Sequence, residues 1–498
     1  MKTTVIICLD EVIATINPNV YGHFAEHLGA CIYEGIWVGE GSSIPNTEGI
    51  RNDVIAALKR IKPAVLRWPG GNFADDYHWQ DGIGPREARP RRVSIWWDAE
   101  ESNQFGTHEF LRFCRLIGAE PYLCGNVGSS YPRELRDWVE YCNYTGDSTL
   151  ARLRAANGSS EPFKVRYWGV GNENWAAGGS FAPEDYAVEY KRFATYMRNF
   201  GGTSLFLVAC GAYGSDPNWT RGFFSKLTGS PSFGVPRLHG FGVHYYCGTA
   251  GTATGYTEQQ WYQLLAAGLK VEEVIAVQRA AMDSYDPQRK LGLIIDEWGA
   301  WHPATKDRNP AHLWQQNTMR DALVAALSLD VFNRNADKIV MGNIAQTINV
   351  LQAMILTDGA KMLVTPTYHV YDLYQGNQGG SSVRMLCDAP AVSFQDKDNK
   401  TGNLPSVTGS ASIKDGMLTV SLVNTQATQA QEVTLILRGG AIKGGAVRVL
   451  AADDIHACNT FESPELVMPK PGQMQSNGTD LHLVLPAASV TVLRAKMA

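Results

Sequence analysis

The sequence predicts an α/β fold in which a closed (β/α)₈ barrel is followed by an antiparallel β-sandwich. From about residue 20 to about residue 372, short apolar or β-branched runs alternate with longer amphipathic stretches, as in parallel sheets whose strands are connected by helices. After about residue 373, Thr, Val and Ser alternate between Gly and Asn turns, which is typical of antiparallel strands. The first residues share this second pattern. We therefore expect a barrel domain at 18–372 and a sandwich domain built from 1–17 plus 373–498.

Eight apolar runs are candidates for the barrel strands, and eight strands close a barrel of this kind. They lie at 21–27, 64–72, 121–128, 165–173, 205–214, 240–246, 291–299 and 338–346. Amphipathic stretches between them predict helices at 52–62, 107–118, 182–200 and 271–285. Pro183, followed by two acidic residues, marks the start of the third helix. Later runs at 406–425, 431–439 and 481–495 predict sandwich strands.

The composition is that of a globular protein, with 44% hydrophobic and 19% charged residues among 498. A net charge of -5 provides no basic surface for nucleic acid or for an anionic membrane, so a neutral or polar small substrate fits better. The apolar run near the start of the sequence is too short and too interrupted for a signal peptide. No stretch reaches the roughly 18 apolar residues of a membrane helix. We expect a soluble, cytoplasmic protein whose nine scattered cysteines are reduced and mostly buried.

Two glutamates follow predicted barrel strands at the end where barrel enzymes carry their catalytic groups. Glu173 ends the fourth strand in GVGNENW, and Glu297 ends the seventh in IIDEWGAW. Carboxyls that approach from different sides of a barrel can flank one glycosidic bond, one protonating the departing oxygen while the other attacks the anomeric carbon. We predict that Glu173 and Glu297 divide these two roles. The alternative is that both are rim acids in salt bridges.

Further polar residues stand near these strand ends. Asn172 could donate a hydrogen bond to a sugar hydroxyl, or could cap the following helix. His244 and Tyr246 end the sixth strand, and Tyr246 could hydrogen-bond the nucleophile or a backbone carbonyl. The glycines before Asn72 let backbone approach a ligand, although turn geometry would also explain them. Four tryptophans could stack on sugar rings or belong to the core: Trp79, Trp175, Trp298 and Trp301.

Two hypotheses from other classes compete with a glycosidase. The first is a metal-dependent hydrolase, suggested by His23 and His27 with Glu26 between them. Two side chains four residues apart converge on one metal when they lie on a helix, but these residues follow a predicted strand, where they do not. The second is a barrel that binds carbohydrate without catalysis. The presence of both Glu173 and Glu297 argues against it.

Taken together and in order, the motifs YGHFAEHLG, RWPGGNF, SNQFGTHEF, GNENW, VHYY, DEWGAW and NVLQAMILT closely resemble glycoside hydrolase family 51, the arabinofuranosidase family. The resemblance covers nearly the whole chain. It implies a TIM barrel with a jelly-roll-like sandwich, and retaining release of terminal non-reducing α-L-arabinofuranosyl residues from arabinoxylan or arabinan oligosaccharides. Related enzymes include some that act on β-xylosides or β-glucans, so β-xylosidase or endo-β-glucanase activity at the same site is the alternative.

The resemblance also implies roles for individual residues. Glu173 matches the acid/base and Glu297 the nucleophile. The positions that match residues holding or lining the furanose pocket are Glu26, Asn72, Asn172, His244, Tyr246, Trp298 and Gln352. The family uses no cofactor and no metal, and is commonly intracellular and homo-oligomeric, so a hexamer or trimer of dimers is expected.

Overall fold

The computed structural model describes residues 2–229, 237–248, 250–477 and 480–498. The chain divides into two compact units. We call Gly22–Tyr245 with Val274–Glu297 the barrel unit, and Met1–Tyr21, Tyr246–Glu273 and Trp298–Ala498 the sandwich unit. The predicted domain boundaries, 18–372 and 1–17 plus 373–498, remain a prediction.

All eight predicted strands are present and close a barrel in the ring order β10-β11-β12-β13-β2-β5-β8-β9. Their bounds are β2 Gly22–Phe24, β5 Val65–Trp68, β8 Glu120–Gly125, β9 Tyr167–Val170, β10 Phe206–Tyr213, β11 Gly240–Cys247, β12 Gly292–Ala300 and β13 Ile339–Ala345. Pairs such as Val65 and Glu120 on β5 and β8 run parallel. Several observed strands are shorter than predicted at their carboxyl ends, because residues there leave the ladder and enter loops.

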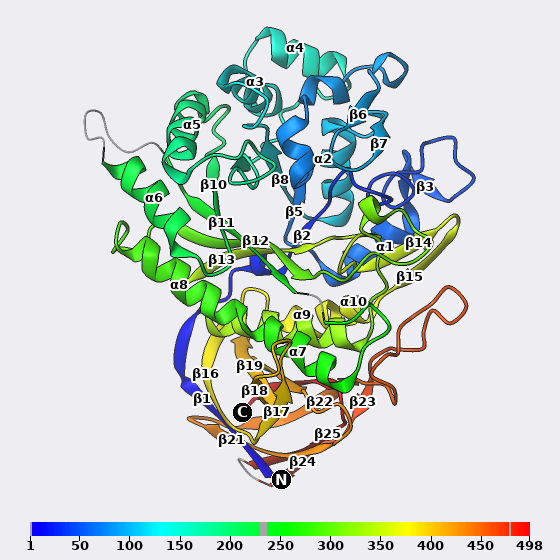
Figure 1. The fold of residues 1–498 in the computed structure, drawn as a ribbon, viewed down its shortest axis with the longest axis vertical. Coiled ribbons are helices and arrows are strands. Elements are labelled where there is room, and N and C mark those ends of the chain that lie inside the picture. Colours follow the sequence, from blue (N-terminus) through cyan, green and yellow to red (C-terminus); the bar gives the residue numbers. More distant parts are fainter. Residues whose placement is uncertain (1, 230–236, 249, 478–479) are drawn as a thin grey trace. The chain divides into compact units, whose positions relative to one another are not determined.

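The four predicted helices are α1 Asn52–Ile61, α2 Thr107–Ile117, α5 Pro183–Tyr196 and α8 Val271–Asp283. The other helices are α3 Pro132–Asn143, α4 Thr149–Ala156, α6 Pro217–Thr228, α7 Glu258–Leu269, α9 Met319–Arg334 and α10 Pro366–Tyr374, with 3-10 helices η1 Pro18–Tyr21, η2 Asn72–Asp76, η3 Trp79–Gly82, η4 Arg86–Ala88, η5 Pro310–His312 and η6 Gln375–Asn377. Helix α2 ends at Ile117, and the next residue, Gly118, has a φ of 80° in the left-handed region that glycine adopts without strain. Figure 1 shows the helices along the chain.

The second large sheet has ten strands, mostly antiparallel, in the order β23-β22-β26-β20-β19-β16-β1-β21-β25-β24. Its strands are β1 Lys2–Thr15, β16 Ser381–Asp388, β19 Val407–Lys414, β20 Met417–Asn424, β21 Gln431–Arg438, β22 Ile442–Leu450, β23 Lys470–Gly472, β24 Gln475–Asn477, β25 Asp480–Leu485 and β26 Ser489–Met497. The N-terminal strand β1 pairs antiparallel with β16 and parallel with β21, beside which it runs in Figure 1. The prediction that the N-terminus joins this sheet is confirmed.

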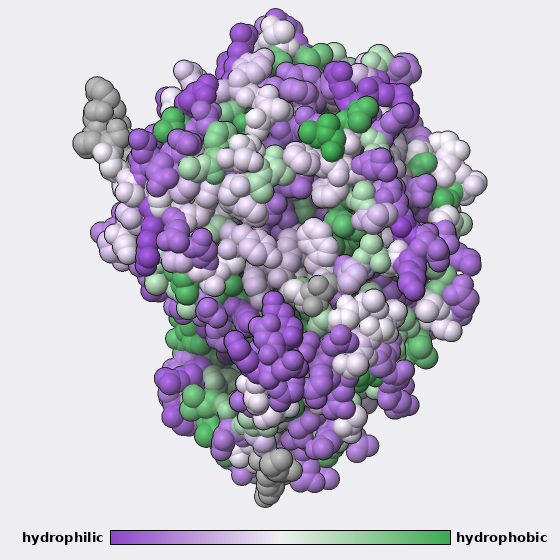
Figure 2. All heavy atoms as spheres, viewed as in Figure 1, coloured by the Kyte–Doolittle hydropathy of each residue, from purple (hydrophilic) through white to green (hydrophobic). Residues whose placement is uncertain are grey.

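Small two-stranded ribbons complete the secondary structure: β3 Asn46–Thr47 with β4 Ile50–Arg51, β6 Arg92–Ser94 with β7 Ala99–Glu101, β14 Ile355–Asp358 with β15 Lys361–Val364, and β17 Ala391–Gln395 with β18 Thr401–Pro405. The nine cysteines are free, and most are buried, as predicted. Among the described residues, no helix is both long and apolar enough to cross a membrane. On the face drawn in Figure 2, hydrophobic residues are scattered among hydrophilic ones.

Candidate active site

Glu173 and Glu297 come together in the barrel unit. Glu173 follows β9 after Gly171 and Asn172, and Glu297 lies within β12. One oxygen of each carboxylate and one ring nitrogen of His244 all lie within 4.8 Å of one another. Both glutamate side chains are largely buried, with 18% of Glu173 and 6% of Glu297 exposed. This separation fits the approximately 5–5.5 Å of retaining glycosidases and not the roughly 6.5–9.5 Å of inverting ones.

His244 bridges the two glutamates. Its Nδ1 atom lies 3.0 Å from Oε1 of Glu173 and 3.5 Å from Oε2 of Glu297. Burial alone would lower the pKa of His244, but the charge of Glu297 and the hydrogen bond and charge of Glu173 raise it above its usual value. The imidazole therefore holds a proton readily and can share it with either carboxylate.

Arg67 on β5 holds Glu297 and Asn172. Its Nη1 donates to Oε1 of Glu297 at 2.6 Å, and its Nη2 donates to Oδ1 of Asn172 at 2.5 Å. The guanidinium is fully buried, and the charges of Asp296 and Glu297 outweigh the effect of burial and raise the pKa of Arg67 well above its usual value. One planar cation thus fixes two of the predicted site residues and stabilises the negative charge of Glu297.

Asn172 keeps one donor for a ligand. Its Nδ2 is buried and has no hydrogen-bond partner among the residues that the structure describes, and the side chain does not cap a helix. A Cβ atom added to Gly71 would lie 3.0 Å from Oε1 of Glu297 and 3.6 Å from Nδ2 of Asn172. The missing side chain of Gly71 therefore leaves space beside both groups, where a hydroxyl could satisfy a donor that is costly to bury alone.

Glu26 lies against the Pro-Gly-Gly turn, and Asn72 directly follows that turn in the sequence. Oε1 of Glu26 accepts hydrogen bonds from the backbone of Phe73 at 3.1 Å and from Nε1 of Trp97 at 3.2 Å. A Cβ atom on Gly70 would collide with Cγ of Glu26 at 2.6 Å, which explains the glycine. Asn72 opens η2 and is half-buried.

Two residues that contact the predicted site residues, Arg67 and Trp97, were not predicted from the sequence. Arg67 is a charge inside an apolar strand, and that anomaly was the available signal. Trp97 stands in the Trp-Trp pair between β6 and β7, where large apolar residues in a short loop were the signal.

The rival hypothesis of a metal site at His23 and His27 is not supported by the positions of these two side chains. Nδ1 of His27 lies 2.7 Å from Oε2 of Glu101, and Nε2 accepts a hydrogen bond from Nε1 of Trp68 at 3.1 Å, so both ring nitrogens are used. His23 is buried on β2, and burial lowers its pKa to about 3. Among the described residues, the side chains with ligand atoms close enough for a metal are Glu173, His244 and Glu297.

The candidate tryptophans differ in exposure. Trp79 is buried, stacks on Trp138 and donates to the carbonyl of Glu134, so it belongs to the core. Trp175 is half-buried and donates to the carbonyl of Gly211.

The remaining predicted residues lie in the sandwich unit. Trp298 is buried edge-on against Phe332. Trp301 is 38% exposed, and its ring lies 5.1 Å from that of Tyr246 in an edge-to-face arrangement. Of these aromatic residues, Trp301 presents the largest free surface.

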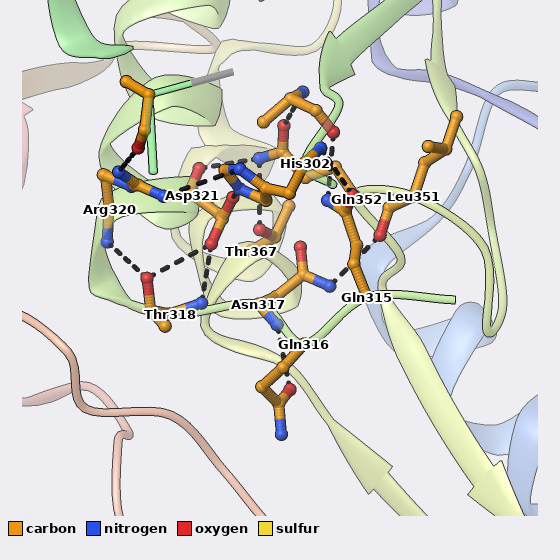
Figure 3. A network of polar contacts seen from close by, with 12 residues as sticks. His302, Gln315, Gln316, Asn317, Thr318, Arg320, Asp321, Leu351, Gln352 and Thr367 are labelled. Carbon is orange, nitrogen blue, oxygen red and sulfur yellow. Dashed lines mark hydrogen bonds and ion pairs between the residues drawn. The ribbon is translucent and has the colours of Figure 1, made fainter. Parts of the chain in front are cut away.

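Gln352 is fully buried in the polar network of Figure 3. Its Oε1 accepts a hydrogen bond from the backbone of Ala300 at 2.8 Å, and its Nε2 donates to the carbonyl of Asp321 at 2.6 Å and to Oγ1 of Thr367 at 3.2 Å. Both amide hydrogens are therefore used, and the contacts fix the end of β12. Its role toward a sugar remains a prediction.

Comparisons with known proteins give a consistent result. Family models described as "Alpha-L-arabinofuranosidase 1 domain" and "Alpha-L-arabinofuranosidase C-terminal domain" match residues 57–256 and 296–489. An intracellular exo-alpha-L-arabinofuranosidase of Bacteroides ovatus is 43% identical over 99% of this chain and 95% of its own length.

Solved structures agree over the full length. The GH51 arabinofuranosidase from Xanthomonas axonopodis pv. citri matches with a TM-score of 0.95 and 39% identity, covering 99% of this chain and 100% of that one. The alpha-L-arabinofuranosidase from Thermotoga maritima in complex with arabinose has a TM-score of 0.88 and 30% identity, with the same coverage. The chain belongs to glycoside hydrolase family 51, the α-L-arabinofuranosidase family.

Proposed function

We propose that this protein is a retaining, exo-acting α-L-arabinofuranosidase that releases terminal non-reducing arabinofuranosyl residues from arabinoxylan or arabinan oligosaccharides. The observation that carries the proposal is the pair of carboxylates, Glu173 and Glu297, with atoms within 4.8 Å of one another. Family membership supports the choice of sugar, since the relatives above are named for that activity.

In the first step, Glu297 attacks the anomeric carbon while Glu173 donates its proton to the leaving oxygen. The glycosidic bond breaks, and an ester forms between the sugar and Glu297. In the second step, Glu173 takes a proton from water, whose oxygen attacks the anomeric carbon and releases Glu297 as a carboxylate. Two inversions leave the configuration unchanged.

Arg67 and His244 prepare the two carboxylates for these roles. Arg67 donates to Glu297 and keeps it negatively charged before attack. His244 contacts both glutamates, and its imidazole accommodates the change of charge when the ester removes the negative charge of Glu297. No metal or cofactor takes part in this scheme.

The free Nδ2 of Asn172 is placed to donate to a sugar hydroxyl next to the reacting carbon, a contact that strengthens in the transition state. Glu26, Asn72, Tyr246, Trp298 and Gln352 complete the proposed substrate-binding set. Of these, Glu26 is supported by its position beside the Pro-Gly-Gly turn.

A cytoplasmic location is part of the proposal and is supported by the name of the intracellular Bacteroides ovatus relative. We also propose a homo-oligomer, a hexamer or trimer of dimers, as the family resemblance implies. Light scattering of the purified protein would test this, because the mass should be about six times that of the 54.6 kDa chain.

A screen of aryl glycosides tests the function. The α-L-arabinofuranoside should be hydrolysed far faster than the β-xyloside or β-glucoside, and NMR should show the α-anomer of arabinose as the first product. Faster turnover of either pyranoside, or a first product of opposite configuration, would overturn the proposal. Binding of arabino-oligosaccharides without any turnover would instead support the non-catalytic alternative.

A further inference from the structure

Asp75 joins the loops that follow three neighbouring barrel strands. It lies in η2, after β5, and its side chain is almost completely buried. Its Oδ1 accepts hydrogen bonds from the backbone N–H groups of Val127 at 2.6 Å and Gly128 at 2.8 Å, in the loop after β8. Its Oδ2 accepts one from the backbone of Asn172 at 2.7 Å, in the loop after β9. One carboxylate of the loop after β5 therefore binds three backbone N–H groups of the loops after β8 and β9.

The loop that carries Glu173 folds back around this carboxylate. The carbonyl of Glu173 accepts hydrogen bonds from the backbone of Ala176 at 2.7 Å and of Gly178 at 3.2 Å. Nδ2 of Asn174 donates to the carbonyl of Gly178 at 2.7 Å and lies 3.5 Å from Oδ2 of Asp75. The φ of Glu173 is 43°, in the left-handed region that is unfavourable for a side chain of this kind, so the loop needs such external contacts to hold it.

Two glycines allow the loops to close on Asp75. A Cβ atom on Gly178 would lie 2.5 Å from Oδ2 of Asp75, and one on Gly128 would lie 3.0 Å from its Cβ. The surroundings are thus fitted to this one side chain on both sides.

Burial disfavours the charged form of Asp75. Burial raises its pKa to about 7, although the N–H groups of Gly128, Val127 and Asn172 and the charge of Arg67 all lower it. Burying a carboxylate lowers stability. The hydrogen bonds by which Asp75 fixes three backbone N–H groups therefore explain its presence better than a contribution to stability does.

We propose that Asp75 is a positioning residue that sets the orientation of the acid/base Glu173, and of Asn172, through the backbone of the loop after β9. It acts through that loop and not on the substrate. The inference rests on the proposed function, because it concerns proton donation by Glu173.

The test compares kcat/KM of wild type and Asp75→Asn for a series of aryl α-L-arabinofuranosides with leaving groups of different pKa. Poor leaving groups need the proton from Glu173 and good ones do not. The kcat/KM of the variant should therefore fall by about 10–100-fold with poor leaving groups but only about 2–3-fold with the best. A misplaced Glu173 loses part of the rate that acid catalysis contributes. The dependence of log kcat/KM on leaving-group pKa should become steeper.

Asp76→Asn is the matched control, because the neighbouring carboxylate makes none of these backbone contacts, and it should behave as wild type. Gly128→Ala is a second variant, which presses on Asp75 without removing it and should give the same leaving-group pattern in milder form, even if Asp75→Asn fails to fold. If folded Asp75→Asn loses kcat/KM equally with all leaving groups, or not at all, the inference is overturned. The proposed function would still stand in that case, because the wild type is active. A wild type inactive on every arabinofuranoside would instead refute the function itself.

Discussion

The guanidinium of Arg67 lies 2.6 Å from the carboxylate of Glu297 and donates with its other arm to Asn172. A planar cation with a fixed fork can hold both partners at once, whereas the ammonium of lysine is a single point on a flexible stem. Glu297 and the amide of Asn172 therefore depend on one side chain for their relative position.

Arg67→Lys should lower kcat/KM on an aryl α-L-arabinofuranoside by about 100-fold or more, because one of the two charge-assisted contacts is lost. Steady-state kinetics measure this. Arg91→Lys is the control, since Arg91 is exposed and pairs with Glu100 at the surface. Near-normal activity in folded Arg67→Lys would mean that the fork is not needed.

Gly71→Ala should reduce activity without unfolding the protein. The new methyl group would stand 3.0 Å from Oε1 of Glu297 and fill space beside Nδ2 of Asn172, so a fall of about 10–100-fold in kcat/KM is expected from displaced substrate. Gly41→Ala provides the comparison, because nothing lies within 4 Å of a Cβ there. If Gly71→Ala and Gly41→Ala are equally active, the space above Gly71 is not part of the site.

Gln352→Ala should lower the free energy of unfolding by about 2–3 kcal/mol, because Ala300 and Asp321 each lose a buried hydrogen-bond partner. Denaturant unfolding followed by tryptophan fluorescence measures it. Unchanged stability of Gln352→Ala would show that these two hydrogen bonds contribute little to the fold.

Asp330 should make the sandwich unit less stable as the pH rises. Burial raises its pKa from 3.8 to about 6, although Ser410, Ser421 and Arg334 act to lower it. A group whose pKa is higher in the folded state stabilises most below its unfolded pKa, and this contribution is lost as the pH rises through about 6. The full change amounts to about 3 kcal/mol.

Asp330→Asn should remove this dependence. The difference in unfolding free energy between wild type and variant, measured from pH 4 to pH 7, should shift against the wild type as the pH rises. A constant difference would show that Asp330 does not titrate in this range.

The sequence allowed the barrel to be predicted because buried parallel strands read as continuous apolar runs, and the two glutamates stand where such runs end. Arg67 was missed because a charge inside an apolar run reads as an interruption. Asp75 and Trp97 act through contacts between loops that are distant in sequence, and no local pattern encodes those contacts. Gln352 illustrates the converse, because a motif position can be recognised while the partners of its amide remain unknown.

The most direct test is the configuration of the products that azide forms with the two glutamate variants. Glu173→Ala should keep turnover on substrates with good leaving groups, and added azide should attack the glycosyl-enzyme to give the α-L-arabinofuranosyl azide. Glu297→Ala should be nearly inert, and any azide product should be the β-anomer, because no ester can form. If Glu173→Ala yields the β-azide, or Glu297→Ala the α-azide, the assigned roles of these two carboxylates are contradicted.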